Sequence, residues 1–307
     1  MKAYFRHHFI FVMALFVLSC DTSNSNSEMN SRKQAFNAKI DIQGHRGARG
    51  LWPENSIYGF IKTAQLGIKT LEMDVLLNGD GEVLVSHDPY FNSQFCLDEN
   101  GNEITDEKEY NLYQMSQSEI DKFDCGSKLY LRFPEQEKIK VTKPLLKDLL
   151  ISMEKEGFDA INYNIEIKSR KEWRGIYQPV SIDDYVKKVL KTLDQLPYDR
   201  YNLQSFDIEI LRSIYQLDPK VRLAYLIEEQ ELSKTTIDSL DFPIYAFSPD
   251  YNLLSEELVA YYQSIGLKVI PWTVNEKSDM KRLAEWGVNG IITDYPNRWI
   301  ELAQSDQ

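Results

Sequence analysis

The sequence has no excess of basic residues and no long apolar run. Its 35 lysines and arginines are outnumbered by 47 aspartates and glutamates, which gives a formal net charge of −12. A nucleic-acid partner would require a basic face, so this balance argues against one. An acidic chain that binds a phosphate must gather positive charge locally. The unbroken apolar run at residues 9–18 is about ten residues long and too short to span a membrane.

Cysteine and histidine are also scarce. Of the three cysteines, Cys20 lies near the front of the chain, and Cys96 and Cys125 lie within one later segment. In an exported protein these two can form a disulfide, or they can stay buried as free thiols, and two cysteines make a metal site unpromising. Of the four histidines, only His45 and His87 lie beyond the first twenty residues.

The first twenty residues predict a targeting segment, with a positive start followed by the apolar run. Residues 17–20, Val-Leu-Ser-Cys, resemble a bacterial lipobox, in which the cysteine, here Cys20, becomes the lipidated N-terminus. An ordinary secretory signal with a chance cysteine is the alternative. Residues 21–38 favour a flexible tether, because the stretch is rich in serine and asparagine. We therefore expect an exported protein, lipid-anchored to a bacterial cell membrane on a periplasmic or outer-membrane face.

Residues 39–305 predict one globular α/β domain, since the chain is 43% hydrophobic and 12% aromatic. Strands and helices alternate with short connections and without a Rossmann glycine pattern, which favours a TIM (β/α)8 barrel. Residues of about 89–141 are irregular and polar, and we expect an insertion there, over the active-site face. A further, weakly marked barrel strand is expected between about Leu129 and Pro144. Strand character is found at 40–43, 70–77, 82–87, 161–167, 203–206, 221–227, 245–248, 268–274 and 290–293.

The segment at 82–87 reads as the return arm of a hairpin whose turn is Asn78-Gly79-Asp80-Gly81. A two-residue loop at 79–80 would set Glu72 opposite His87, and a loop at 80–81 would set Asp74 opposite His87. Because side chains alternate along a strand, either register predicts that both carboxylates and the imidazole share one face.

Polar residues follow the strands at the end where barrel active sites are built. Glu72, Asp74 and Glu166 are three carboxylates that we expect to converge. Close carboxylates repel one another, and a divalent cation relieves this; an all-oxygen set suits Ca²⁺ or Mg²⁺. The alternative is a salt-bridge network with Arg46 and Lys168.

His45 and His87 are candidates for general acid and general base, because imidazole titrates near neutral pH. Arg46 and Lys168 are candidates for phosphate binding, since a guanidinium can grip phosphate oxygens in a bidentate way. Histidines packed in the core and cations that merely balance the acids are the structural alternatives.

Five motifs in order, His45-Arg46-Gly47, Pro53-Glu54-Asn55-Ser56, Glu72-Met73-Asp74, His87-Asp88 and Ile165-Glu166-Ile167-Lys168, resemble the glycerophosphodiester phosphodiesterases. The resemblance extends from about Ile40 to about Ile300. It implies a TIM barrel, a glycerophosphodiester substrate, and an alcohol and sn-glycerol 3-phosphate as products. By similarity, His45 and His87 are the acid–base pair, and Glu72, Asp74 and Glu166 hold one divalent cation.

The resemblance further implies attack by the substrate's own glycerol hydroxyl, giving a cyclic phosphate that water then opens. Glu54 stands where the family has a glutamate near the catalytic histidine and the metal. The candidate substrate-binding residues are Arg46, Lys168, Glu54, Asn55 and Trp272.

Two other functions stay open. A lysophospholipase D or phospholipase-C-like relative would act on intact lipid and would need an exposed apolar rim, which the sequence does not reveal. A non-catalytic lipoprotein would use the barrel only to bind phosphate esters. The sequence leaves the alcohol group and the oligomeric state undetermined.

Overall fold

The structure, a computed structural model, describes residues 40–228, 237 and 240–305. The predicted targeting segment, Cys20 and the tether lie outside these residues. Within them, no helix has both the length and the apolar character that a membrane crossing demands.

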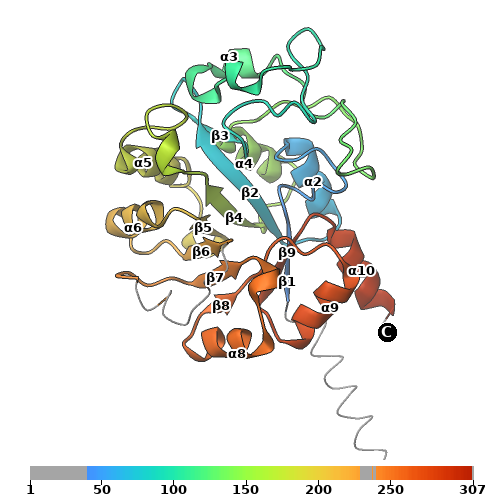
Figure 1. The fold of residues 1–307 in the computed structure, drawn as a ribbon, viewed down its shortest axis with the longest axis vertical. Coiled ribbons are helices and arrows are strands. Elements are labelled where there is room, and N and C mark those ends of the chain that lie inside the picture. The colour runs from blue at the N-terminus through green and yellow to red at the C-terminus, as the bar shows by residue number, and fades with distance from the viewer. Residues whose placement is uncertain (1–39, 229–236, 238–239, 306–307) are drawn as a thin grey trace, which may run out of the picture. The chain divides into compact units, whose positions relative to one another are not determined.

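Eight parallel strands in the described part of the chain form a barrel, which confirms the predicted fold (Figure 1). Neighbours follow the order β8-β7-β6-β5-β4-β2-β1-β9. Between β8 and β9 the ring is closed by backbone hydrogen bonds from Asn289 N to Val269 O (2.9 Å) and from Ile292 N to Pro271 O (3.0 Å). The strands are β1 (Asp41–Gly44), β2 (Thr70–Leu77), β4 (Asn162–Ile167), β5 (Tyr201–Ser205), β6 (Leu223–Ile227), β7 (Ala246–Pro249), β8 (Lys268–Val269) and β9 (Gly290–Thr293).

Helices surround the strands and alternate with them along the chain (Figure 1). Most carry an apolar stripe at helical spacing that packs on the barrel, as in α5, where Tyr185, Val186 and Val189 are buried. Ser56 caps the N-terminus of α2, because its hydroxyl accepts a hydrogen bond from Gly59 N at 3.0 Å. The helices are α2 (Ile57–Gln65), α4 (Leu146–Lys155), α5 (Ile182–Thr192), α6 (Ile208–Leu217), α8 (Glu256–Ser264), α9 (Lys277–Glu285) and α10 (Pro296–Ser305).

The insertion packs as a small layer at the end of the β2–β3 hairpin, where β3 is Val83–Val85 (Figure 1). It holds the short helix α3 (Gln117–Ile120) and an apolar cluster in which Phe91 stacks on Phe123 with ring centroids 3.9 Å apart. Cys96 and Cys125, which the sequence left open, form a disulfide.

The prediction of a barrel strand between about Leu129 and Pro144 is wrong. That stretch is irregular, and its end makes a single antiparallel bridge, Leu84 with Leu145. The other strands already complete the ring, so the barrel has no position for a further one.

The hairpin register differs from both predicted ones. Val75 faces Val85 and Leu77 faces Val83, a register that would set His87 against Met73 and not against an acid. The cause is a three-residue loop, since Asn78 N bonds to Glu82 O at 3.0 Å. The Asn78 side chain stabilises this loop by accepting from the backbone N–H groups of Asp80 and Glu82. The paired residues end at Val85, and one further backbone bond joins Ser86 N to Asp74 O at 3.0 Å. His87 lies just beyond it and lines the same cavity as Glu72 and Glu166.

One buried hydroxyl fixes α5 against the barrel. Tyr185 is fully buried, and its hydroxyl donates to Val75 O at 3.0 Å and lies 3.1 Å from Lys168 O. We expect Tyr185→Phe to lower the free energy of unfolding by about 1–3 kcal/mol, because a buried hydroxyl contact to two carbonyls is lost and only Val75 O keeps another donor, the Lys168 N–H. Urea unfolding measures this. Tyr198→Phe is the control, since the Tyr198 hydroxyl bonds to Asp218 at the surface and its loss should change little.

Candidate active site

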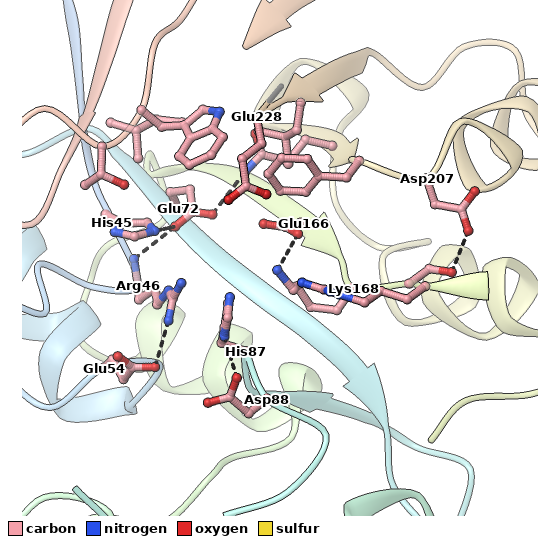
Figure 2. A pocket seen from close by; sticks show the side chains of 18 of the residues that line it. His45, Arg46, Glu54, Glu72, His87, Asp88, Glu166, Lys168, Asp207 and Glu228 are labelled. Carbon is pink, nitrogen blue, oxygen red and sulfur yellow. Dashed lines mark hydrogen bonds and ion pairs between the residues drawn. The ribbon is translucent and has the colours of Figure 1, made fainter. Parts of the chain in front are cut away.

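A cavity of about 930 Å³ opens at the carboxyl ends of the strands and holds most of the predicted site residues. Figure 2 shows that His45, His87 and Lys168 point into this cavity from different strands and loops. Barrel enzymes build their active sites at this end. The structure thus brings most of the predicted site residues to the expected end of the barrel.

The turn after β1 positions the first histidine and arginine. Arg46, Gly47 and Ala48 all have positive φ, at 51°, 76° and 60°. A Cβ on Gly47 would lie 3.1 Å from the Phe60 ring, so glycine is required for both conformation and space. The turn directs the Arg46 N–H at the Glu72 carboxylate, 3.0 Å away.

Glu72, Asp74 and Glu166 form a buried carboxylate trio. They offer one oxygen each within 4.8 Å of one another, an arrangement that could hold a metal ion. Glu72 and Asp74 share a face of β2, and Glu166 is the register partner of Asp74 on β4. Asp74 Oδ1 is buried and has no hydrogen-bond donor among the described residues. A buried carboxylate oxygen that has no hydrogen-bond donor and lies near two further carboxylates is suited to bind a cation.

The pKa values of the trio reflect this crowding. Burial, with Asp74 and Glu166, raises the pKa of Glu72 well above its usual value. Burial raises the pKa of Glu166 to about 7 despite Lys168. Burial would also raise the pKa of Asp74, but Arg46, His87 and Lys168 outweigh it and hold that pKa well below the usual range. Without a cation the trio therefore retains protons at neutral pH.

Two cations lie against the trio. Arg46 Nε is 3.1 Å from Asp74 Oδ2, and Lys168 Nζ is 2.7 Å from Glu166 Oε1 and 3.8 Å from Asp74 Oδ1. Both side chains also line the cavity. The salt-bridge network considered from the sequence is thus present, and it leaves the same two cations next to the cavity where a phosphate would sit.

Each histidine is held by its own aspartate. His45 Nδ1 lies 2.5 Å from Asp294 Oδ1, and His87 Nδ1 lies 2.8 Å from Asp88 Oδ1. Asp88 is fixed in turn by Asn92, which donates at 2.9 Å. A proton on Nδ1 shared with a carboxylate leaves Nε2 as the ring atom that can exchange a proton in the cavity.

Both histidines are neutral at neutral pH. Burial and the nearby Arg49 lower the pKa of His45 to about 4, against the opposing effect of Asp294. Burial, then Arg46 and Lys168, lower the pKa of His87. A neutral imidazole with a free Nε2 is the form required of a general base.

The other candidate residues have more indirect positions. Glu54 accepts from Arg46 at 3.1 Å, and Arg49 lies 3.6 Å from its second oxygen. Asn55 does not line the cavity but donates to Asp74 Oδ2 at 2.9 Å. Trp272 lines the cavity edge-on to Phe206, and its indole donates to Ser248 O at 2.8 Å.

Sequence reasoning missed several partners of the site. Asp294 was not among the predicted site residues, and its pairing with His45 spans 249 positions. Arg49, which donates to Asp294 at 2.8 Å, and Gln204, which donates to Glu72 at 3.0 Å, were given no role. Arg49, Gln204 and Asp294 lie at or just after the carboxyl ends of β1, β5 and β9. That position could have identified them as site residues from the sequence.

Asp294→Asn should lower kcat about 100-fold and leave KM within about threefold. An amide keeps the shape but neither stabilises an imidazolium nor fixes the His45 tautomer. Steady-state kinetics separates the two constants, and the exposed Asp241→Asn is the control. A loss confined to KM would mean that Asp294 serves substrate binding instead.

Comparisons with known proteins agree with this geometry. The model of the glycerophosphoryl diester phosphodiesterase family matches residues 45–298. A glycerophosphodiester phosphodiesterase of Bacillus subtilis (strain 168) is 30% identical, over 93% of this chain and 95% of that protein. The crystal structure of a proposed glycerophosphoryl diester phosphodiesterase from Silicibacter pomeroyi DSS-3 has a TM-score of 0.78 at 28% identity, covering 90% of this chain and 97% of that one. An Oleispira antarctica phosphodiesterase in complex with the product sn-glycerol-3-phosphate has a TM-score of 0.69 at 23% identity, covering 89% and 99%.

Proposed function

The chain belongs to the glycerophosphoryl diester phosphodiesterase family, and on this premise we propose that it hydrolyses glycerophosphodiesters to an alcohol and sn-glycerol 3-phosphate. The observation that carries the proposal is the pair of His–Asp couples beside a buried carboxylate trio in one cavity. The product that accompanies the Oleispira antarctica relative supports the choice of substrate.

We propose that Glu72, Asp74 and Glu166 hold one divalent cation, Ca²⁺ or Mg²⁺. Their all-oxygen donor set and the unsatisfied Asp74 Oδ1 favour such hard ions over zinc. When bound, the ion would offset the negative charge of the phosphate and of the transition state.

Arg46 and Lys168 bind the phosphate in this proposal, because both cations line the cavity beside the trio. Glu54 orients the Arg46 guanidinium, and Asn55 orients Asp74. Trp272 packs against the glycerol part of the substrate. These roles follow from position and chemistry together.

His45 and His87 exchange protons with the substrate through Nε2. One neutral histidine takes the proton of the glycerol hydroxyl as that oxygen attacks phosphorus. The other takes up a proton on Nε2 when the negatively charged phosphate is bound beside it, and it gives that proton to the departing alcohol oxygen. In the second step the roles reverse, because the deprotonated histidine now accepts a proton from the water that opens the cyclic phosphate. Asp294 and Asp88 stabilise whichever ring is charged.

We also propose that residues 39–305 act as the catalytic domain of an exported protein anchored through lipid on Cys20. The lipobox-like Val-Leu-Ser-Cys stretch and the polar residues after it support this. A metabolic label of palmitate that is lost on Cys20→Ala is the test.

The function is tested by incubating the full chain with glycerophosphocholine and Ca²⁺ or Mg²⁺ and identifying the products. Equal amounts of choline and sn-glycerol 3-phosphate are expected. Phosphocholine and glycerol instead would indicate phospholipase-C-like cleavage. Saturable binding without either product would indicate a binding protein and contradict the proposal.

A further inference from the structure

Two apolar side chains stand out on the described surface. Leu131 is 83% exposed and Val180 is 76% exposed, more than any other large apolar residue that the structure describes. Scattered apolar residues are ordinary on a protein surface, so exposure alone means little. Their position in the fold is what requires an explanation.

Both residues lie in loops that bound the mouth of the catalytic cavity. Leu131 stands between Tyr130 and Arg132, which both line the cavity. Val180 lies in the loop that leaves the carboxyl end of β4, and Arg174 of the same loop lines the cavity. The neighbours of these tips, Leu129 and Ile176, are themselves 46% and 51% exposed.

The two loops are tied to the surrounding structure. Asn111 of the insertion donates to Ile176 O at 2.8 Å, and the Tyr90 and Tyr177 rings meet edge-on with centroids 6.3 Å apart. Lys128 donates to Ser93 O at 2.7 Å, next to Leu129. The exposed side chains are therefore held outward by packed backbone.

Cations lie in the same two stretches of chain as the apolar tips. Residues 128–132 read Lys-Leu-Tyr-Leu-Arg, and the β4 loop begins with Arg170 and Lys171 and reaches Trp173. Arg132 and Arg170 lie over the rings of Phe133 and Trp173, each with 5.4 Å from the guanidinium carbon to the ring centroid. Apolar tips with interfacial aromatics and adjoining cations form the combination that favours a membrane–water interface.

We propose that this rim, Leu129–Arg132 with Arg170–Val180, docks on a phospholipid bilayer. Leu131 and Val180 enter the acyl boundary, and the flanking cations contact lipid phosphates. Charge favours this occupant, because the two stretches carry four cations, Arg132, Arg170, Lys171 and Arg174, against one acid, Glu172, on a chain whose net charge is −12. Arg174 pairs with Asp207 and Glu209, and Arg170 lies 4.0 Å from Glu172, so Arg132 and Lys171 supply most of the contact with lipid phosphates. A protein partner spanning both tips would cover the polar cavity between them, whereas a bilayer presents lipid headgroups to it. Docking stands independently of the proposed reaction, but its value for capturing substrate rests on that reaction.

The test compares the full chain with its Leu131→Asp/Val180→Asp variant. The matched control is Leu66→Asp/Ile265→Asp, because these residues are exposed at helix ends that lead into β2 and β8, at the opposite end of the barrel. Each protein is mixed with vesicles of phosphatidylcholine and phosphatidylglycerol that carry brominated acyl chains. Tryptophan quenching reports insertion, and Trp173→Phe identifies its source.

We expect strong quenching for the wild type and the control, and its loss in the rim variant and in Trp173→Phe. Turnover of lysophosphatidylcholine in vesicles should fall about tenfold or more in the rim variant, while turnover of soluble glycerophosphocholine stays within about twofold. Equal quenching of the rim variant and wild type overturns the proposal. Dimerisation of the wild type through the rim, without tryptophan quenching by the vesicles, would also overturn the proposal. Quenching that depends on the rim, with no turnover of soluble diester by the wild type, would contradict the proposed function and leave docking standing.

Discussion

We expect chelation of divalent cations to abolish turnover of glycerophosphocholine, and Glu72→Gln to lower kcat/KM by about 10³-fold. The magnitude follows from a bound ion that contributes several kcal/mol of charge stabilisation, with about 1.4 kcal/mol for each factor of ten. Glutamine keeps the size of the side chain and can accept from either Gln204 or the Arg46 N–H, but it removes one of three charges. Full activity in the presence of chelator would contradict the metal site.

The control for this variant is Glu172→Gln. Glu172 lines the same cavity, but its side chain is 69% exposed and lies outside the trio. It should change turnover less than about twofold. Glu72→Gln should not lower the free energy of unfolding of the cation-free protein, because burial and like charges already favour a neutral Glu72. A loss of activity with unchanged folding therefore points to the ion.

The same geometry sets the pH dependence of cation binding. The pKa of Glu72 is raised, and that of Glu166 is about 7, so both carboxyls hold protons that a cation must displace. We expect the affinity for Ca²⁺ to rise with pH through about 7, where Glu166 loses its proton, and to keep rising while Glu72 still holds one. Calorimetric titration at several pH values measures this, and proton release on binding should shrink over the same range.

We expect replacement of either histidine by alanine to lower kcat by about 10²–10⁴-fold, the range for loss of a general acid or base. Since both act in each step, His45→Ala/His87→Ala should be little worse than the more damaging single variant. Cation affinity should stay within a few fold. Additive losses would mean that the two histidines act independently.

A substrate with a good leaving group separates the two roles. Glycerophospho-p-nitrophenol needs no proton on its departing oxygen, so the histidine that acts as acid in the first step becomes dispensable for that step. Rescue of one alanine variant identifies that residue. Rescue of neither would contradict proton donation to the leaving alcohol.

The barrel fold and most residues of the site could be predicted from the amino-acid sequence alone. Strand and helix periods are local properties, and a parallel barrel brings the carboxyl ends of its strands to one face wherever they lie in the chain. His45, Glu72, Asp74 and Glu166 could therefore be placed together from their positions in strands alone. Alternation along β2 was enough to put two carboxylates on one side.

The contacts of each site residue could be found only from the tertiary structure. Asp294 meets His45 because β9 closes the ring next to β1, and no local pattern encodes that pairing. The Asn78 side chain added a residue to the hairpin loop, which set His87 against neither acid. Likewise, the exposure of Leu131 and Val180 depends on what packs around them and not on their own chemistry. Local periodicity fixes which residues share a face, whereas packing between distant segments fixes what each of them touches.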